Sequence, residues 1–390
     1  MARKGYSVTV NGLVLRWARE TIGATEREVA KRVGTTEAVV KNWETGDVKL
    51  SLRQLKKLSA FFRRPLAALL LPKPPPEPAL PQDFRRLPGK PPGTLSRQAH
   101  LVIRKVRRLQ TIAAELLDQL GDKEKRFRQP ARDPSGDPEN IAKEIRVSLG
   151  ISVDAQKAWS NPQMAFAEWR KAIESQNVLV FQMSFPLEDG RGFSLAHERL
   201  PVIVVNQRDA VTARIFTLIH EYAHLLIRVP GICGPELEDV AGDRSADRIE
   251  VFCNRLAAAI LVPPEDLRDT ARALKTSDLL HEARRIAYRV YKVSPQVLLR
   301  RLCELGFIPY QAYRQARDAE KTFEEQLPKR VKKPPAHMRC LRELGRPFVS
   351  LVLEASDKEI ITTRDASDLL SLNLDQLRTL HDALRQPIPR

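Results

Sequence analysis

One short segment of the 390-residue chain has the residue types and the spacing that suit metal-dependent hydrolysis. It reads His220-Glu221-Tyr222-Ala223-His224. Residues four apart lie one turn above each other on a helix, so both imidazoles can reach one ion. Zinc held by two neutral histidines and a carboxylate keeps a fourth position for water. The spacing therefore predicts a site for one zinc ion.

Glu221 directly follows the first predicted ligand and is the candidate general base. Zinc lowers the pKa of a bound water toward neutrality, and an adjacent carboxylate can take its proton. The same carboxylate can then pass that proton to the leaving amine of a peptide. The motif lies between the apolar residues 216–219 and 225–227. Imidazoles without a ligand would be costly to bury there, so a pair of surface histidines is disfavoured.

The third ligand must come from beyond the motif helix. Residues 231–247 read as a polar loop with five acidic side chains: Glu236, Glu238, Asp239, Asp243 and Asp247. A helix predicted over 247–261 carries Glu250, 26 residues beyond His224, which is enough chain for a loop and a return. Spacing alone leaves open whether Glu250 is a ligand or a solvent-facing carboxylate. Asn254, one turn further on, could orient a metal ligand by hydrogen bonding.

Helices and short strands are expected around the motif. Apolar periodicity predicts the motif helix over 213–227. Short runs of buried, β-branched character predict strands over 178–181 and 201–205, and a helix is expected over 162–176. The metal site should therefore lie on a helix packed against a small sheet.

The first 71 residues read as a bundle of five short helices, predicted over 14–20, 26–33, 36–44, 52–62 and 66–71. Thr25 and Glu28 have the spacing of a capping box, and Gly34 marks a tight turn. Two helices joined by such a turn form a helix-turn-helix, whose second helix can enter a DNA major groove. The residues expected to face DNA are Thr35, Thr36, Glu37 and Lys41.

Residues 13–71 resemble the XRE (lambda-repressor-like) helix-turn-helix family. The resemblance rests on Glu28-Val29-Ala30, on Gly34 and on Trp43-Glu44-Thr45-Gly46. One departure is Glu26, which stands where the family usually has glutamine and which repels a phosphate. The resemblance favours DNA binding, and a domain used for dimerisation or for docking a protein remains the alternative.

Residues 201–310 resemble the ImmA/IrrE family of metallopeptidases. The matching stretches are 201–206, 215–221, 250–263 and 293–306. The resemblance implies that His220, His224 and Glu250 are the ligands and that Glu221 is the base. The departure at Tyr222-Ala223, where the family more often has Leu-Gly, does not touch the ligands. Members of this family cleave XRE-type repressors and so release stress or mobile-element genes.

The predicted fold is multidomain and mainly α-helical. It comprises an all-α helix-turn-helix domain, an α+β zincin-like metallopeptidase core with a small sheet, and a helical C-terminal extension. Two proline-rich stretches favour extended connectors between them. The predicted boundaries are 1–71 for the helix-turn-helix domain, 72–95 for a proline-rich linker, 96–310 for the metallopeptidase domain with its preceding helices and trailing bundle, 311–335 for a basic linker and 336–390 for the C-terminal unit.

Composition restricts the cellular compartment and the classes of binding partner that are expected. The formal charge is +17 and the pI about 9.9, an excess that favours contact with nucleic acid. The apolar runs are too short to span a bilayer, and no signal-peptide stretch follows the N-terminal residues. The four cysteines form no C-x-x-C pair, which fits reduced thiols. We therefore expect a cytoplasmic protein with no membrane partner.

These patterns predict a zinc-dependent, site-specific endopeptidase that regulates transcription. Its substrate would be an XRE-type repressor, or its own connector at 72–92, cleaved in response to stress or mobile-element signals. The expected partners are this protein substrate, DNA and a second copy joined through the N-terminal domain. Two alternatives stay open: a DNA-binding regulator whose zinc domain is a sensor or a structural module, and the effector of a toxin–antitoxin or prophage module.

Overall fold

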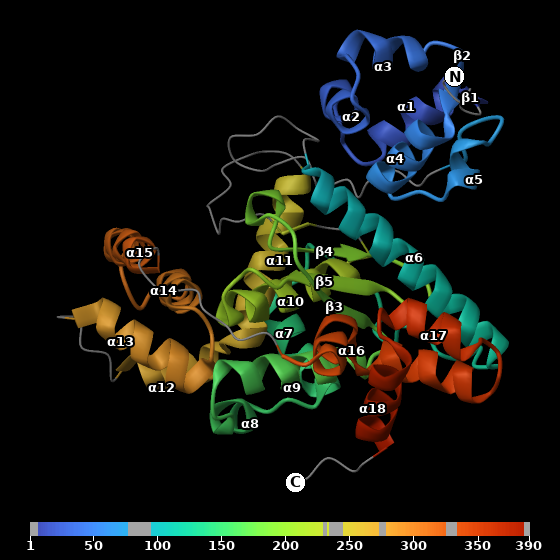
Figure 1. Ribbon diagram of the computed structural model, residues 1–390. Helices are drawn as coiled ribbons and strands as arrows, with labels where there is room; N and C mark the ends of the chain where they lie inside the picture. Colours follow the sequence, from blue (N-terminus) through green and yellow to red (C-terminus); the bar gives the residue numbers. More distant parts are fainter. Residues whose placement is uncertain are drawn as a thin grey trace. The chain divides into compact units, whose positions relative to one another are not determined.

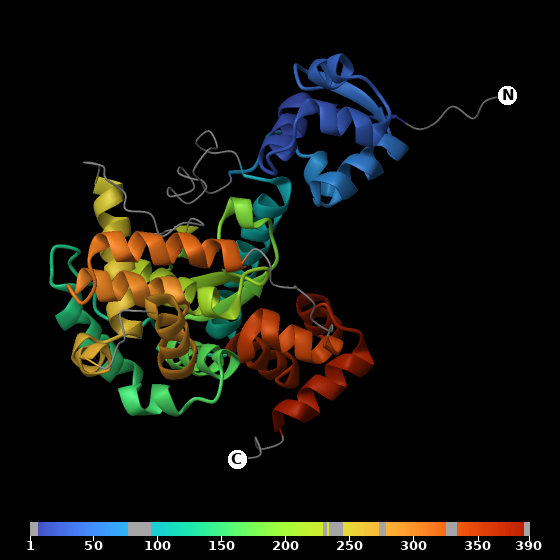
Figure 2. The same ribbon diagram turned by 90° about the vertical axis from the view of Figure 1, so that its left-hand side faces the viewer.

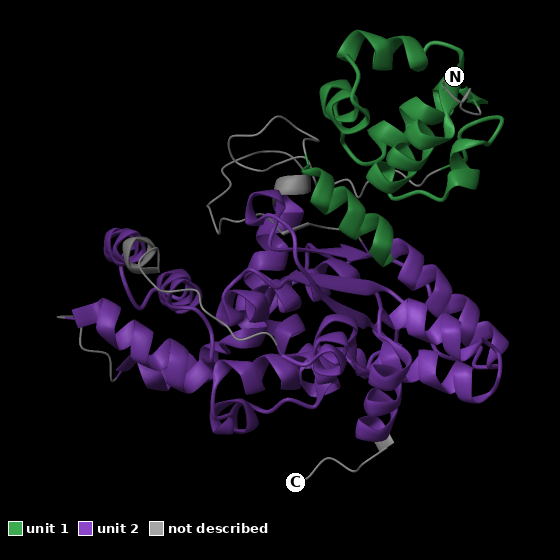
Figure 3. Cartoon of the chain, in the orientation of Figure 1, with its two compact units in different colours: residues 1–106 green, residues 107–390 purple. Residues whose placement is uncertain are grey.

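The computed structural model describes residues 7–76, 95–228, 232–233, 245–272, 278–324 and 334–385. The chain divides into two compact units, residues 1–106 and 107–390 (Figure 3). The boundary falls inside one helix, α6 (Arg97–Gln119). Most of the predicted linker at 72–95, and the part of the basic linker from 325 to 333, lie outside the described residues.

Unit 1 is a small helical domain closed by a two-stranded sheet. Its elements are β1 (Ser7–Asn11), α1 (Gly12–Glu20), α2 (Glu26–Val33), α3 (Glu37–Trp43), β2 (Asp47–Ser51), α4 (Leu52–Phe62) and α5 (Leu66–Leu69). The five helices follow the prediction closely. The antiparallel pair of β1 and β2 is an addition that the sequence did not predict. Each strand is five residues long and runs directly into a helix, which is too short a run for alternation to stand out.

A buried ion pair ties the helices of unit 1 together. The guanidinium of Arg19 on α1 donates two hydrogen bonds of 2.7 Å to the carboxylate of Glu44, which follows α3. Glu26, at the start of α2, lies 3.3 Å from the same guanidinium. The hydrogen bonds that Arg19 donates to Glu44 raise the pKa of Arg19 above its usual value. Glu26, the residue that departs from the family pattern, is thus paired with Arg19 inside the domain.

Removing the charge of Arg19 is expected to destabilise unit 1. An Arg19→Met change keeps most of the stem but leaves Glu44, which is only 4% exposed, without its bidentate partner. Breaking a buried pair in this way typically costs about 3–5 kcal/mol. Chemical denaturation would measure the loss. Arg27→Met, an exposed arginine on α2, is the control and should stay within about 0.5 kcal/mol of wild type; an equal effect of both changes would contradict the prediction.

Unit 2 is built around a four-stranded sheet. The strands are β3 (Leu179–Met183), β4 (Gly192–Leu195), β5 (Val202–Asn206) and β6 (Ile232–Cys233), in the order β3-β5-β4-β6. β3 pairs with β5 in parallel, whereas β4 is antiparallel to both of its neighbours. All residues of β3, β4 and β5 are buried. Complete burial of this kind is typical of strands covered on both faces.

Helices surround this sheet (Figure 1). Those that precede the motif are α6, α7 (Pro138–Leu149), α8 (Val153–Ala158) and α9 (Pro162–Glu174). The motif helix α10 (Val211–Leu226) packs against α9, β4, β5 and α11 (Ser245–Leu261). The trailing helices are α12 (Pro264–Arg272), α13 (Leu279–Ile286), α14 (Pro295–Glu304) and α15 (Tyr310–Glu324). α15 therefore occupies residues that we had assigned to the basic linker.

The C-terminal unit comprises α16 (Ala336–Asp357), α17 (Thr363–Leu370) and α18 (Leu374–Arg385), which pack on one another (Figure 2). α16 lies against β3, where Phe348 meets Phe181 edge to face at 5.6 Å between ring centroids. α16 is kinked at Gly345, whose φ of 75° favours glycine. A Cβ at that position would lie 2.5 Å from the side chains of Arg170 and Glu174. In the described part of the chain, no helix has the length and apolar character to cross a membrane.

Candidate metal centre

The motif helix α10 lies in the centre of the unit 2 core. Every residue from 215 to 226 is buried, which matches the apolar sequence around the motif. His220 is 1% exposed and His224 is fully buried. Because they are four residues apart, their rings project from the same face of α10, with centroids 4.7 Å apart. Packing of the core around this helix therefore restricts where the two imidazoles can lie.

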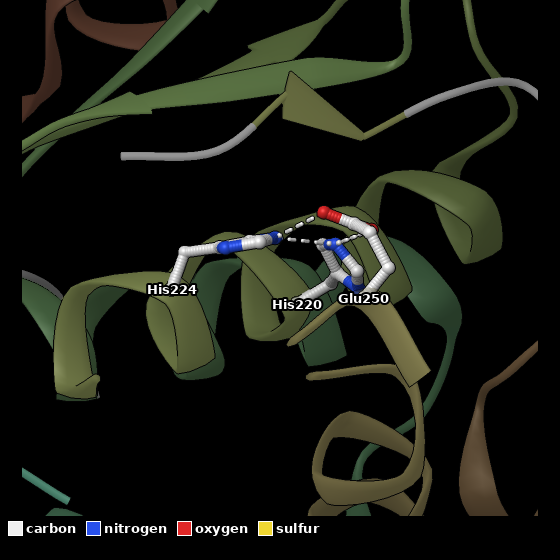
Figure 4. Close-up of side chains that lie close together, drawn as sticks. All are labelled: His220, His224 and Glu250. Atoms are coloured by element: carbon white, nitrogen blue, oxygen red, sulfur yellow. Dashed lines mark hydrogen bonds and ion pairs between the residues drawn. The ribbon is translucent and has the colours of Figure 1, made fainter. Parts of the chain in front are cut away.

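The third residue comes from α11, which packs along α10. Residues 256–262 near its C-terminal end are buried, and the three alanines among them allow close contact between helices. This packing brings Glu250 opposite the two histidines (Figure 4). The other acidic candidates for the third ligand are not placed: Glu236, Glu238, Asp239 and Asp243 lie outside the described residues, as does the side chain of Asp247.

The three side chains converge on one point. The Nε2 atoms of His220 and His224 are 3.0 Å apart. The Glu250 carboxylate approaches both of them, with Oε2 3.3 Å from His220 Nε2 and Oε1 3.0 Å from His224 Nε2. All three potential ligand atoms lie within 4.8 Å of one another. This is the only group of three or more such side chains among the described residues.

The donor set fits zinc. Two imidazoles and one carboxylate are the ligands of several catalytic zinc sites, which keep one position open. Zinc–nitrogen distances of about 2.0–2.1 Å place two tetrahedral ligand atoms roughly 3.3 Å apart, close to the separation of the two Nε2 atoms. In this part of the structure the outward Nδ1 atoms of His220 and His224 are buried and make no hydrogen bond. The close approach of the two Nε2 atoms to each other and to the Glu250 oxygens is the arrangement that a shared cation would hold together.

The protonation of the site reflects its close packing. Burial alone would lower the pKa of His224, but the Cys253 thiol and the Glu250 carboxylate beside it raise that pKa well above its usual value. Burial alone would raise the pKa of Glu250. The hydrogen bonds from the two imidazoles nevertheless hold that pKa far below the ordinary range. The Glu250 carboxylate therefore stays ionised and acts as a counter-charge for His224.

Glu221 lies on the same helix, fully buried beside the ligand group. Burial raises its pKa to about 7, against the opposing effects of the two histidines and of a hydrogen bond with Ser194. Ser194 is a buried residue of β4, and the sequence analysis did not identify it. A carboxyl group whose pKa is near neutrality suits a group that must both accept and return a proton.

Gly192 lets β4 approach the motif helix closely enough for this contact. A Cβ at Gly192 would lie 2.5 Å from Thr217 Cγ2 and 2.6 Å from the Val204 carbonyl oxygen. Gly192→Ala is therefore expected to lower the free energy of unfolding by about 1–3 kcal/mol, the usual cost of overpacking. Thermal and denaturant unfolding would measure it. Gly46→Ala, where a Cβ meets nothing within 4 Å, is the control and should change stability little.

Asn254 was predicted to orient a metal ligand, but its neighbour Cys253 is the residue that lies beside the site. Cys253 is fully buried on α11, and its thiol is one of the groups that raise the pKa of His224. Asn254 is half-buried and makes no hydrogen bond to either imidazole within the described residues. Cys253 is three residues from Glu250 and so shares its helix face. That spacing was the available sequence signal.

Unit 1 presents the four predicted DNA-facing residues at the turn and on α3. Thr36 is exposed and caps α3, its side chain accepting a hydrogen bond from the Val39 amide. Glu37 and Lys41 are exposed and form an ion pair of 3.1 Å with each other. Thr35, in the turn after Gly34, is half-buried. The geometry is that of a helix-turn-helix, with one of its candidate cations paired to a neighbouring carboxylate.

Two family models match the chain. Residues 173–303 match the peptidase family described as the IrrE N-terminal-like domain, and residues 15–69 match the helix-turn-helix family. No match was found among curated proteins or among solved structures. The chain thus combines an N-terminal helix-turn-helix domain with an IrrE-like peptidase domain, which confirms the two resemblances seen in the sequence.

Proposed function

We propose that this protein is a zinc-dependent endopeptidase that regulates transcription by cleaving a helix-turn-helix repressor. The observation that carries the proposal is the convergence of His220, His224 and Glu250 inside a domain of a peptidase family. His220, His224 and Glu250 would hold one zinc ion. A bound zinc ion supplies a Lewis acid that polarises a peptide carbonyl and lowers the pKa of water. A cytoplasmic location is part of this proposal.

The residues of the chain then have distinct tasks. Glu221 takes the proton of the attacking water and returns it to the nitrogen of the leaving amine. Ser194 holds the Glu221 carboxylate in place by its hydrogen bond. The surrounding apolar side chains of α10 exclude bulk water and so strengthen these electrostatic interactions. Unit 1 brings the enzyme to DNA or to DNA-bound repressors.

The test is a comparison of new protein N-termini in cells that express wild type or Glu221→Gln. This change removes the base but leaves the three ligand side chains. New termini that appear only with wild type, within one repressor or within the 72–92 connector, would support the proposal and name the substrate. An identical set of termini in both strains, during normal growth and under stress, would contradict it.

A second candidate function is DNA-binding regulation in which the peptidase domain acts as a sensor. Its support is the charge of unit 1. Residues 1–106 contain 21 lysines and arginines against eight aspartates and glutamates, so this unit carries +13 of the chain's +17. Such an excess is typical of a nucleic-acid-binding domain. Under this reading Glu221→Gln would leave regulation intact, whereas His220→Ala would not.

DNA binding by unit 1 leads to a paired expectation on α3. Lys41→Ala is expected to weaken binding to duplex DNA across sequences and to reduce the slope of log affinity against log salt by about 1. Glu37→Ala should strengthen binding, because it frees Lys41 from its ion pair. Fluorescence anisotropy over a series of salt concentrations would measure both. An unchanged slope in both variants would show that α3 does not face the phosphates.

A further inference from the structure

The C-terminal unit repeats the architecture of the N-terminal helix-turn-helix at a constant offset of 337 residues. α1 ends at Glu20 and α16 ends at Asp357. α2 and α17 each have eight residues, Glu26–Val33 and Thr363–Leu370. α3 begins at Glu37 and α18 begins at Leu374. Four consecutive helix boundaries therefore coincide when one segment is laid on the other.

In both helix-turn-helix segments the first helix, α2 or α17, begins with the same kind of cap. Thr25 accepts a hydrogen bond from the Glu28 amide, and the Glu28 carboxylate accepts one from the Thr25 amide. Thr362 and Asp365 form the same reciprocal pair. Both capping boxes fix the point at which the helix starts.

The turn between the two helices is also the same. Gly34 and Ser371 both have left-handed backbone conformation, with φ of 85° and 54°. In each turn the next amide reaches back five residues, from Thr35 to the Ala30 carbonyl and from Leu372 to the Ser367 carbonyl, at 3.0 Å in both cases. This pair of features defines a Schellman-type helix end.

In both segments the cap of the second helix, α3 or α18, lies two residues after the left-handed residue of the turn. Thr36 accepts a hydrogen bond from the Val39 amide, and Asn373 accepts one from the Gln376 amide. The buried positions coincide too, in the pairs Ala18 and Ala355, Val29 and Ala366, Val33 and Leu370, Val40 and Leu377. Residues 346–385 thus fold as a second helix-turn-helix, with buried residues at the same positions as in the first.

The surface of this second helix-turn-helix is unlike the first. Residues 346–385 contain seven aspartates and glutamates against five lysines and arginines, a net charge of −2. Asp368 stands where unit 1 has Lys31, and the exposed face of α18 carries Asp375 and Asp382 with Arg378 between them. Leu374, at the start of α18, is 53% exposed. Duplex DNA would be repelled by these carboxylates, whereas an apolar side chain with a charged rim suits contact with a protein.

A surface on unit 1 complements this face. On α4 of unit 1, Leu52 is 44% exposed and is flanked by the exposed Arg53 and Lys56. The exposed face of α18 has the complementary arrangement, in which Leu374 lies beside carboxylates. Opposite charges around apolar contacts steer association and fix its register.

We propose that the C-terminal helix-turn-helix docks on the basic N-terminal helix-turn-helix domain of a second copy of the chain. Reciprocal docking of two such surfaces about a two-fold axis closes the assembly as a dimer. This association does not depend on peptidase activity, so it stands apart from the function proposed above.

The test uses full-length protein in analytical ultracentrifugation at about 0.1 and 0.5 M salt, where exposed charges are weakly and strongly screened. Wild type is expected to dimerise at low salt and to dissociate at high salt. Leu374→Lys with Asp375→Lys should raise the dimer dissociation constant roughly tenfold or more. The matched control is Met164→Lys with Asp154→Lys, which removes another exposed apolar side chain and another acid from unit 2. Circular dichroism checks that each variant folds.

A charge exchange identifies the docked surface. Arg53→Asp with Lys56→Asp should also give monomers, because it reverses the N-terminal face. Mixing this variant with the Leu374→Lys/Asp375→Lys variant should restore a dimer, since both reciprocal contacts then join opposite charges. A monomeric wild type, a mixture that stays monomeric, or a C-terminal variant that alters DNA affinity without altering association would each overturn the proposal.

Discussion

Replacing His224 with alanine is expected to abolish zinc retention and peptidase activity together. The Nε2 atom of His224 lies 3.0 Å from the Nε2 of His220 and 3.0 Å from the Glu250 carboxylate, so it occupies the middle of the ligand group. Its loss leaves two ligands where a catalytic zinc site needs three. The fall in metal affinity should exceed the roughly 10–100-fold that follows loss of an outer hydrogen-bonding partner.

The measurement is the metal content of purified, dialysed protein by mass spectrometry, followed by titration with zinc. His281→Ala is the matched control, because His281 is an exposed histidine on α13 of the same unit. It should retain one zinc ion per chain. Stoichiometric, tight zinc binding by the His224→Ala variant would show that the ion is held elsewhere and would remove the basis of the proposed hydrolysis.

The motif helix could be predicted because its sequence and its environment agree. The apolar residues 216–219 and 225–227 indicate a buried helix, and α10 is buried from residue 215 to 226. The spacing of His220 and His224 alone places both rings on one face. Long, strongly patterned helices are the elements that a single sequence predicts best.

Other contacts of the site depend on tertiary packing that no local pattern encodes. Ser194 reaches Glu221 only because β4 packs against α10, and β4 is four residues long. Whether Glu250 or a residue of the preceding loop faces the histidines depends on how α11 returns along α10. Spacing alone had therefore left Glu250 undecided, and the convergence of the three side chains is what favours it as the third ligand.

The C-terminal repeat was missed for a different reason. Its apolar residues do not repeat those of unit 1 by identity: Ala366 corresponds to Val29, Leu370 to Val33. The two segments share caps, helix lengths and a left-handed turn, which are backbone features. Residues as different as glycine and serine supply that turn, so the likeness emerges only from the structure.

Replacing Glu221 with glutamine is expected to lower kcat by about 10²–10⁴-fold while zinc binding persists. The amide has the shape of the carboxylate but cannot take a proton from the attacking water. The change also removes a buried ionisable group whose pKa is raised to about 7, so folding should not suffer. Because none of the three predicted ligands is altered, the metal content should equal that of wild type.

Ser194→Ala separates proton transfer from the positioning of the base. It removes the hydrogen bond to Glu221 but leaves the carboxylate in place, so its loss of kcat should be smaller than that of Glu221→Gln. The rate of cleavage of the substrate identified by its new N-termini would measure both, with Glu168→Gln on α9 as a matched Glu-to-Gln control. Equal rates for wild type and Glu221→Gln would mean that the buried carboxylate does not act as the base. A variant that has lost its zinc would instead assign Glu221 a structural role at the metal centre.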